Sequence, residues 1–135
     1  MLFLICALPL HAWHSPARGT ADRADLMDAM RPHIEWIFGA PIVFVVSDLR
    51  VDGDAAFAIL TPQRPDGRPL TRNDLRHPAP DGENPFDYDG ASVQALLKRS
   101  GDTWVAVHWA IGATDVWWFW DGYCSDWSGV LTELC

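Results

Sequence analysis

The chain has 135 residues, a length typical of a single domain, and 49% of them are hydrophobic, enough for a core. The formal net charge is −8, and the ten Lys and Arg residues are scattered along the chain. This charge disfavours binding to nucleic acid or to an anionic membrane surface.

The N-terminal segment has the pattern of a secretion leader. Residues 2–10 form an apolar run as long as the hydrophobic region of a signal peptide and too short to span a bilayer. Ser15 and Ala17 suit positions −3 and −1 of a cleavage site. The sequence therefore predicts a signal peptide over residues 1–17 and an exported mature chain, periplasmic or secreted, without a membrane span. The alternative is an N-terminal strand or a buried arm of the domain.

The cysteine count agrees with export. Loss of the leader removes Cys6 and leaves Cys124 and Cys135, an even pair that can form a disulfide in an oxidising compartment. Closing a loop of about a dozen residues stabilises a fold by roughly 3 kcal/mol in the chain-entropy treatment. The sequence predicts this disulfide, and the alternative is two unpaired thiols.

The mature chain begins with a predicted helix over residues 20–38. Thr20 or Asp22 can cap its start, and Gly39 stands just beyond its end. Its apolar residues recur at helical spacing and form one stripe: Leu26, Met27, Met30, Ile34, Ile37 and Phe38. Pro32 lies inside this pattern and predicts a kink or a break.

Strand patterns follow the helix. Four segments are rich in apolar, β-branched and aromatic residues: 42–51, 55–61, 91–98 and 103–111. Turn signals at Asp52-Gly53 and at Ser100-Gly101-Asp102 join them into two hairpins. The sequence predicts one α+β domain over residues 18–135, in which the N-terminal helix packs on a curved antiparallel sheet of about four strands.

The last strand is apolar on both faces, whereas a sheet with one face in water alternates apolar and polar residues. Strict alternation would place one set of side chains on one face: Val105, Val107, Trp109 and Ile111. The opposite face would carry Trp104, Ala106, His108 and Ala110. The helix can cover one face, so the C-terminal tail or a partner chain, such as the second copy of a homodimer, must cover part of the other.

Residues 62–90 form a long Pro-rich loop, with six of the ten prolines. Loops of this length are usually functional or disordered, so a flexible surface loop and a binding lid are both open. Its acidic residues offer oxygen ligands of the kind that calcium binds: Asp81, Glu83, Asp87 and Asp89. Their spacing is not that of an EF-hand, and the favoured interpretation is a solvated acidic loop.

Short helices are predicted in the tail that follows Gly112. Thr114 or Asp115 can cap the first, and Ser125 or Asp126 can start the second. Four tryptophans make this tail a candidate interaction surface: Trp117, Trp118, Trp120 and Trp127. Adjacent tryptophans cannot all face inward on one short helix, so at least one should be exposed or lie at an interface.

The string Gly112-Ala113-Thr114-Asp115-Val116-Trp117 resembles a GATDVxW-like motif near the end of a family of short exported bacterial proteins of unknown function. The similarity extends to short pieces elsewhere: residues 44–46, 49–54, 95–99 and 104–107. It implies an exported domain and no particular activity. The layout also resembles the cystatin and nuclear-transport-factor-2 class of folds, an architectural comparison that does not carry function.

His108 is the best placed of the histidines for chemistry. It lies between two alanines that could leave a shallow pocket, beside Trp109, and Asp115 could orient its imidazole and raise its pKa. The bland alternatives are a structural histidine and a helix-capping Asp115. His33 and His77 have no metal-ligand spacing, so the sequence predicts no metal or other cofactor.

Two functional hypotheses follow. No nucleophile motif, phosphate-binding loop or nucleotide fingerprint is present, which favours an exported, non-catalytic binding or interaction module whose tail and 62–90 loop meet a protein or a small molecule. The alternative is a small-ligand pocket, or a minor enzyme of the nuclear-transport-factor-2 type, that uses His108 and Asp115.

Overall fold

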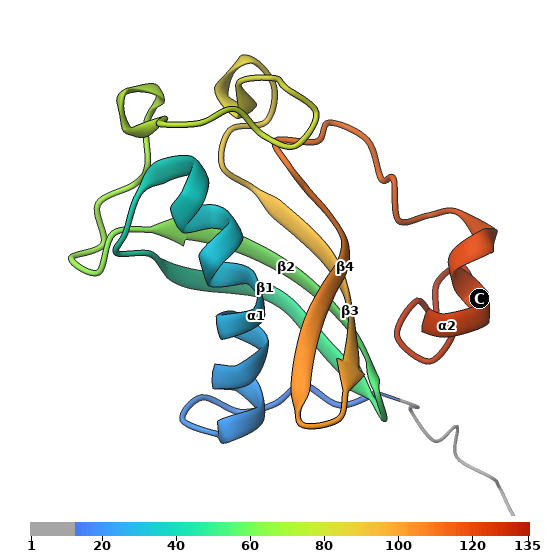
Figure 1. Cartoon of the computed structure of the whole chain (residues 1–135). Coiled ribbons are helices and arrows are strands. Elements are labelled where there is room, and N and C mark those ends of the chain that lie inside the picture. The colour runs from blue at the N-terminus through green and yellow to red at the C-terminus, as the bar shows by residue number, and fades with distance from the viewer. Residues whose placement is uncertain (1–12) are drawn as a thin grey trace, which may run out of the picture.

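A computed structural model describes residues 13–135. The apolar run of the predicted leader, with Cys6, lies outside the described residues. One long helix, α1, and four strands form the body of the domain: α1 (Ala21–Phe38), β1 (Val43–Asp52), β2 (Ala55–Gln63), β3 (Val93–Ser100) and β4 (Thr103–Ile111). Short helices follow the strands: η1 (Arg72–Asp74), η2 (Pro85–Asp87), η3 (Asp121–Tyr123) and α2 (Cys124–Trp127). The predicted α+β layout is confirmed, because α1 packs on an antiparallel sheet of order β1-β2-β3-β4 (Figure 1).

Helix α1 begins and ends as predicted. The Thr20 side chain accepts a hydrogen bond from the Arg23 amide at 3.4 Å, and the Gly39 amide donates to Glu35 O at 2.7 Å. All six apolar residues of the predicted stripe are buried. The helix runs without interruption through Pro32, so the predicted break is absent. Met30 and Ile34, on either side of Pro32, are fully buried and hold both halves of the helix against the sheet.

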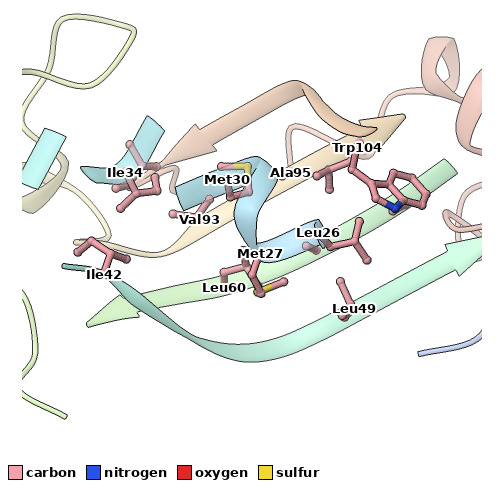
Figure 2. Packing of buried hydrophobic residues seen from close by; sticks show 14 of the residues in the cluster. Leu26, Met27, Met30, Ile34, Ile42, Leu49, Leu60, Val93, Ala95 and Trp104 are labelled. Atoms are coloured by element: carbon pink, nitrogen blue, oxygen red, sulfur yellow. The ribbon is translucent and has the colours of Figure 1, made fainter. Parts of the chain in front are cut away.

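The main core lies between α1 and the sheet. Leu26, Met30 and Ile34 of the helix meet side chains from all four strands, as Figure 2 shows. The strand residues include Leu49 and Leu60, both almost completely buried. Burial of each large aliphatic side chain contributes roughly 1.5–3 kcal/mol, so this layer supplies most of the hydrophobic stabilisation of the sheet's first face.

A β-bulge in β4 changes which side chains share a face. Leu96 pairs with His108 while Leu97 pairs with Ala106, so Val107 is an extra residue in β4. The predicted strict alternation is therefore wrong: Trp104 and Ala106 join Trp109 and Ile111 in the core under α1. One extra residue moves every later side chain to the other face.

The C-terminal tail covers the second face of the sheet. Phe57 and Leu96 pack there against tail residues Trp127, Val130 and Leu131. In Figure 1 the tail, in orange and red, lies on the other side of the sheet from α1. The sequence analysis named the tail or a partner chain as the cover of this face, and the tail covers part of it.

The predicted helix over Trp117 to Trp120 is absent, and with it the predicted helix-capping role of Asp115. Residues 112–120 are irregular apart from a turn in which the Phe119 amide donates to Val116 O at 2.9 Å. Along this irregular path, Trp117 and Trp118 both pack against the buried cluster on the second face of the sheet, which includes Phe57, Leu96 and Trp127.

Two links hold the tail against the domain. The predicted disulfide is confirmed between Cys124 and Cys135, with Cα atoms 5.7 Å apart. Arg50 of β1 donates to Val130 O at 3.0 Å and to a Glu133 carboxylate oxygen at 2.7 Å. The last residues of the chain are thus attached to α2 and to an edge strand of the sheet.

Two carboxylates should make stability depend on acid pH. The hydrogen bond from Arg50 holds the pKa of Glu133 below its usual range, and Arg68, with the Thr71 amide, does the same for Asp74. A carboxyl whose pKa is depressed in the folded state stabilises the fold above its unfolded value of about 4, and this contribution is lost as the pH falls.

We therefore expect urea unfolding to show a free energy that decreases from pH 6 to pH 3. The double variant Glu133→Gln, Asp74→Asn should show a shallower decrease, because neither amide titrates. Asp102→Asn, at an exposed turn, serves as the control. Identical slopes for the double variant and the unaltered chain would contradict the assignment.

Residues 13–17, which the leader prediction includes, contact the domain. His14 pairs with Val51 at the outer edge of β1 through two backbone hydrogen bonds of 2.9 Å. The Arg50 guanidinium lies 4.9 Å from the centre of the Trp13 ring, and Arg23 donates to Pro16 O at 3.1 Å. These contacts fit the buried-arm alternative for this part of the segment, and the cleavage position stays a prediction.

A chain that begins at Arg18 should accordingly be less stable than one that begins at Trp13. Loss of the two hydrogen bonds between His14 and Val51 should lower the free energy of unfolding by roughly 1–3 kcal/mol. Urea unfolding of the two purified chains measures the difference. Equal stabilities would mean that residues 13–17 contribute nothing to the fold.

Candidate functional site

A cavity of about 550 Å³ opens between the Pro-rich loop and the end of β4. The loop contributes residues between Ala79 and Tyr88, and the other wall runs from Trp109 to Trp117. Three aromatic side chains line it: Tyr88, Trp109 and Trp117. Three carboxylates line it as well: Asp81, Glu83 and Asp115. Its volume lies within the range of small-ligand sites, about 300–1,000 Å³.

Gly112 connects the two walls of the cavity through backbone hydrogen bonds. Its amide donates to Ser92 O at 2.9 Å, and its carbonyl accepts from the Asp89 amide at 3.2 Å. The residue has φ of 72°, and a Cβ there would lie 2.9 Å from the Pro85 Cα and carbonyl oxygen. The first residue of the GATDVxW-like string is therefore glycine for a steric reason, because the loop backbone crosses directly over it.

The loop wall is shaped by its own hydrogen bonds. The Asp81 carboxylate accepts from the Glu83 amide at 3.0 Å, and the Ala79 amide donates to Glu83 O at 3.0 Å. Phe86, from η2, packs edge-on against Phe38 of α1 with ring centres 5.9 Å apart. These contacts hold the loop in the conformation in which Asp81 and Glu83 line the cavity.

The aromatic cluster of the tail positions the opposite wall. The Trp117 indole donates to Gln94 Oε1 at 3.4 Å, and the buried Gln94 amide in turn donates to Ser92 Oγ at 3.1 Å. Trp117 also packs edge-on against Trp118 and Tyr123, at ring-centre distances of 5.8 and 6.0 Å. The Trp117 ring thus belongs both to the tail packing and to the cavity wall.

The cavity is negatively charged. None of its lining residues is Lys, Arg or His, and within residues 13–135 no ion pair involves Asp81, Glu83 or Asp115. The basic residue Arg72 of the same loop is engaged elsewhere, with Asp87 at 2.7 Å. Three carboxylates therefore face one opening without a counter-charge.

A second, smaller cavity of about 350 Å³ adjoins the first on the side of α1. Pro80 and Trp109 contribute to the walls of both cavities. Trp36 also lines the second, is 64% exposed, and stacks on His77 with ring centres 3.8 Å apart. Trp36 lies outside the apolar stripe of α1, and that position was the only sequence signal for its exposure.

The residues of the predicted pocket do not all come together. Trp109 and Asp115 line the large cavity, but His108 does not. The bulge at Val107 turns His108 toward the second face, where its ring centre lies 5.0 Å from that of Tyr123 and 5.5 Å from that of Trp127. His108 therefore packs with the tail, apart from the cavity that Asp115 lines.

The predicted tryptophan surface is largely internal. Trp127 is 4% exposed, and Trp117 and Trp118 are half-buried. Trp120 is 59% exposed and packs edge-on against Tyr123. Sequence analysis did not single out Phe119, which is exposed beside it.

The acidic residues of the Pro-rich loop are divided among different roles. Asp81 and Glu83 line the cavity, whereas Asp87 pairs with Arg72. Within residues 13–135, no three His, Cys, Asp or Glu side chains are grouped so that they could hold a metal ion. Within the same range, no helix combines the length and the hydropathy that crossing a membrane requires.

Comparison with known proteins gives no indication of function, so the proposal below rests on the geometry of the cavity. No protein-family model matches the chain, and no curated protein or solved structure is significantly similar to it. The resemblance of residues 112–117 to the motif of exported bacterial proteins stays a prediction.

Replacement of Gly112 with alanine should loosen this site. Alanine at positive φ costs more than about 1 kcal/mol, and the contact with Pro85 should push the loop away from β4. Gly101→Ala is the matched control, because Gly101 also has positive φ but no atom near its Cβ position. Urea unfolding should show the larger loss for Gly112→Ala, and equal losses would contradict the steric role of Gly112.

Proposed function

We propose that this protein is a non-catalytic binding module that takes a small organic group into the cavity between residues 79–88 and 109–117. The observation that carries the proposal is the cavity itself, with its aromatic and carboxylate lining and no basic side chain. Sites of this size with a few convergent polar groups are where ligands most often bind.

The chemistry of the walls supports binding rather than catalysis. They contain no His, Cys, Ser or Lys side chain, so a nucleophile paired with a nitrogen base is missing from them. The alternative hypothesis from the sequence, a pocket or minor enzyme, requires His108 as the base. His108 instead packs against Trp127 and Tyr123 on the other face of the sheet. The alternative of a pocket shared by His108 and Asp115 therefore has less support.

Export is part of the proposal. The Cys124–Cys135 disulfide is compatible with an oxidising compartment, and the apolar run at residues 2–10 resembles a leader. The N-terminal mass of the protein recovered from the exported fraction tests this directly. Recovery with Met1 retained would contradict cleavage of a leader.

Chemical-shift mapping tests the binding site. A fragment library with neutral, cationic and anionic members is titrated into ¹⁵N-labelled protein, and backbone amide shifts are followed. At least one fragment should move the amides of residues 79–88 and 109–117 together and saturably. Shifts confined to the exposed surface of Val116, Phe119 and Trp120, or no shifts at all, would contradict the proposed site.

A further inference from the structure

The cavity points to a ligand that carries an organic cation, and we infer that its preferred head group is a quaternary ammonium or a protonated amine. This inference rests on the proposed function, because it names the class of ligand for the same cavity. Three independent features of the described residues support it.

The first feature is the aromatic lining. Trp109 and Trp117 supply two indoles, and Tyr88 supplies a phenol that is 57% exposed. Indole is the best partner for a cation over a ring face, and such contacts contribute about 0.5–2 kcal/mol each. A site that gathers three aromatic rings around one cavity is the usual arrangement for quaternary ammonium groups.

The second feature is the charge of the same walls. Asp81 and Glu83 approach from the loop and Asp115 from the tail, and none of the three has an ion-pair partner within residues 13–135. An anionic ligand would be repelled by all three, whereas a cation supplies the missing counter-charge. The formal net charge of −8 adds a long-range attraction for cations.

The third feature separates an organic cation from a metal ion. Within the described residues, the carboxylates of the cavity do not form a group that could hold a metal. Metal sites need several oxygen ligands converging on one point, whereas an ammonium group can be stabilised by spread charge and by ring faces. Aromatic walls with separated carboxylates fit the ammonium group better.

Calorimetric titration with a matched pair of probes tests the inference. Choline and 3,3-dimethylbutan-1-ol have the same shape and differ in charge. We expect choline to bind at least roughly tenfold more tightly, the size of one good cation–ring contact, and acetate not to bind. Nα-acetyl-lysine methylamide, which keeps a protonated side-chain amine, forms a second arm. It distinguishes a ligand with a free quaternary ammonium from one with the amine of a peptide side chain.

Variants identify the groups responsible. Tyr88→Leu and Asp115→Asn alter exposed side chains that form no side-chain hydrogen bond within residues 13–135, so both should fold. Each should weaken choline binding by roughly three- to tenfold. Asp102→Asn removes the same charge at the opposite end of β4 and should leave the affinity unchanged, which separates a local effect from one of net charge.

Equal affinity for choline and its neutral isostere would overturn the inference. The proposed function would stand in that case, because a ligand would still bind in the cavity. Failure of every cationic probe to bind would also overturn the inference, and the fragment titration would then decide the proposed function separately. Equal weakening by Asp102→Asn and Asp115→Asn would overturn the local role of the cavity carboxylates.

Discussion

Trp127→Ala is expected to lower the free energy of unfolding by about 3–5 kcal/mol, the usual cost of removing a buried aromatic side chain. Trp127 is 4% exposed and lies at the centre of the cluster that joins the tail to the sheet. Its indole donates to Leu97 O at 2.9 Å, so the substitution also leaves a buried carbonyl of the sheet with one partner fewer. Urea unfolding at pH 7 measures the loss.

Trp120→Ala provides the matched control for this prediction. Trp120 belongs to the same tail but is 59% exposed, so its removal should cost under about 1 kcal/mol. Similar losses for the two variants would show that the tail does not pack on the sheet as described. Because Trp117 is part of the same packing, Trp127→Ala should also weaken ligand binding in the cavity.

Removal of the disulfide is the second change with a large expected effect. The bond between Cys124 and Cys135 closes a loop with a sequence separation of 11, and opening a loop of this size should cost roughly 3 kcal/mol. The double variant Cys124→Ser, Cys135→Ser should therefore unfold at lower urea concentration. Amide exchange should become faster from α2 to the C-terminus.

The contact between Arg50 and Glu133 should limit how far the C-terminal residues are released when the disulfide is removed. It should keep the last residues near β1 even without the disulfide, so adding Glu133→Gln to the double variant should release them further. An unfolding midpoint in the Cys124→Ser, Cys135→Ser variant equal to that of the unaltered chain would contradict a stabilising role for the disulfide.

The sequence was sufficient wherever local patterns determine structure. The stripe of α1, its cap at Thr20 and the first hairpin are all short-range features, although the hairpin turns at Gly53-Asp54, one residue later than the predicted Asp52-Gly53. The observed bounds of the strands lie within a few residues of the predicted ones for the same reason. The disulfide followed from an even count of cysteines rather than from geometry.

The register of β4 against β3 could not be predicted from the sequence. The bulge at Val107 is invisible in a strand that is apolar on both faces, because either alternation buries apolar side chains. It decides that Trp109 lines the cavity and that His108 does not. The irregular path of residues 112–120 depends in the same way on packing against β3, which overrides a weak helical pattern.

The cavity could be anticipated only in part. Asp115 and Trp109 were singled out from the sequence, and Asp81 and Glu83 were noted as acidic loop residues. Nothing in the sequence placed the loop over Gly112, because that contact joins segments more than twenty residues apart. An acidic loop and an aromatic tail in one short chain are the sequence features that agree with the proposed cation site.

A titration of the ¹⁵N-labelled protein with choline, followed through the indole N–H resonances of the tryptophans, tests whether the cavity binds an organic cation. We expect the indole N–H signals of Trp109 and Trp117 to move saturably, while that of the buried Trp104 stays in place. Movement of neither cavity indole, or movement only of the exposed Trp36 and Trp120, would contradict binding of the cation in the cavity.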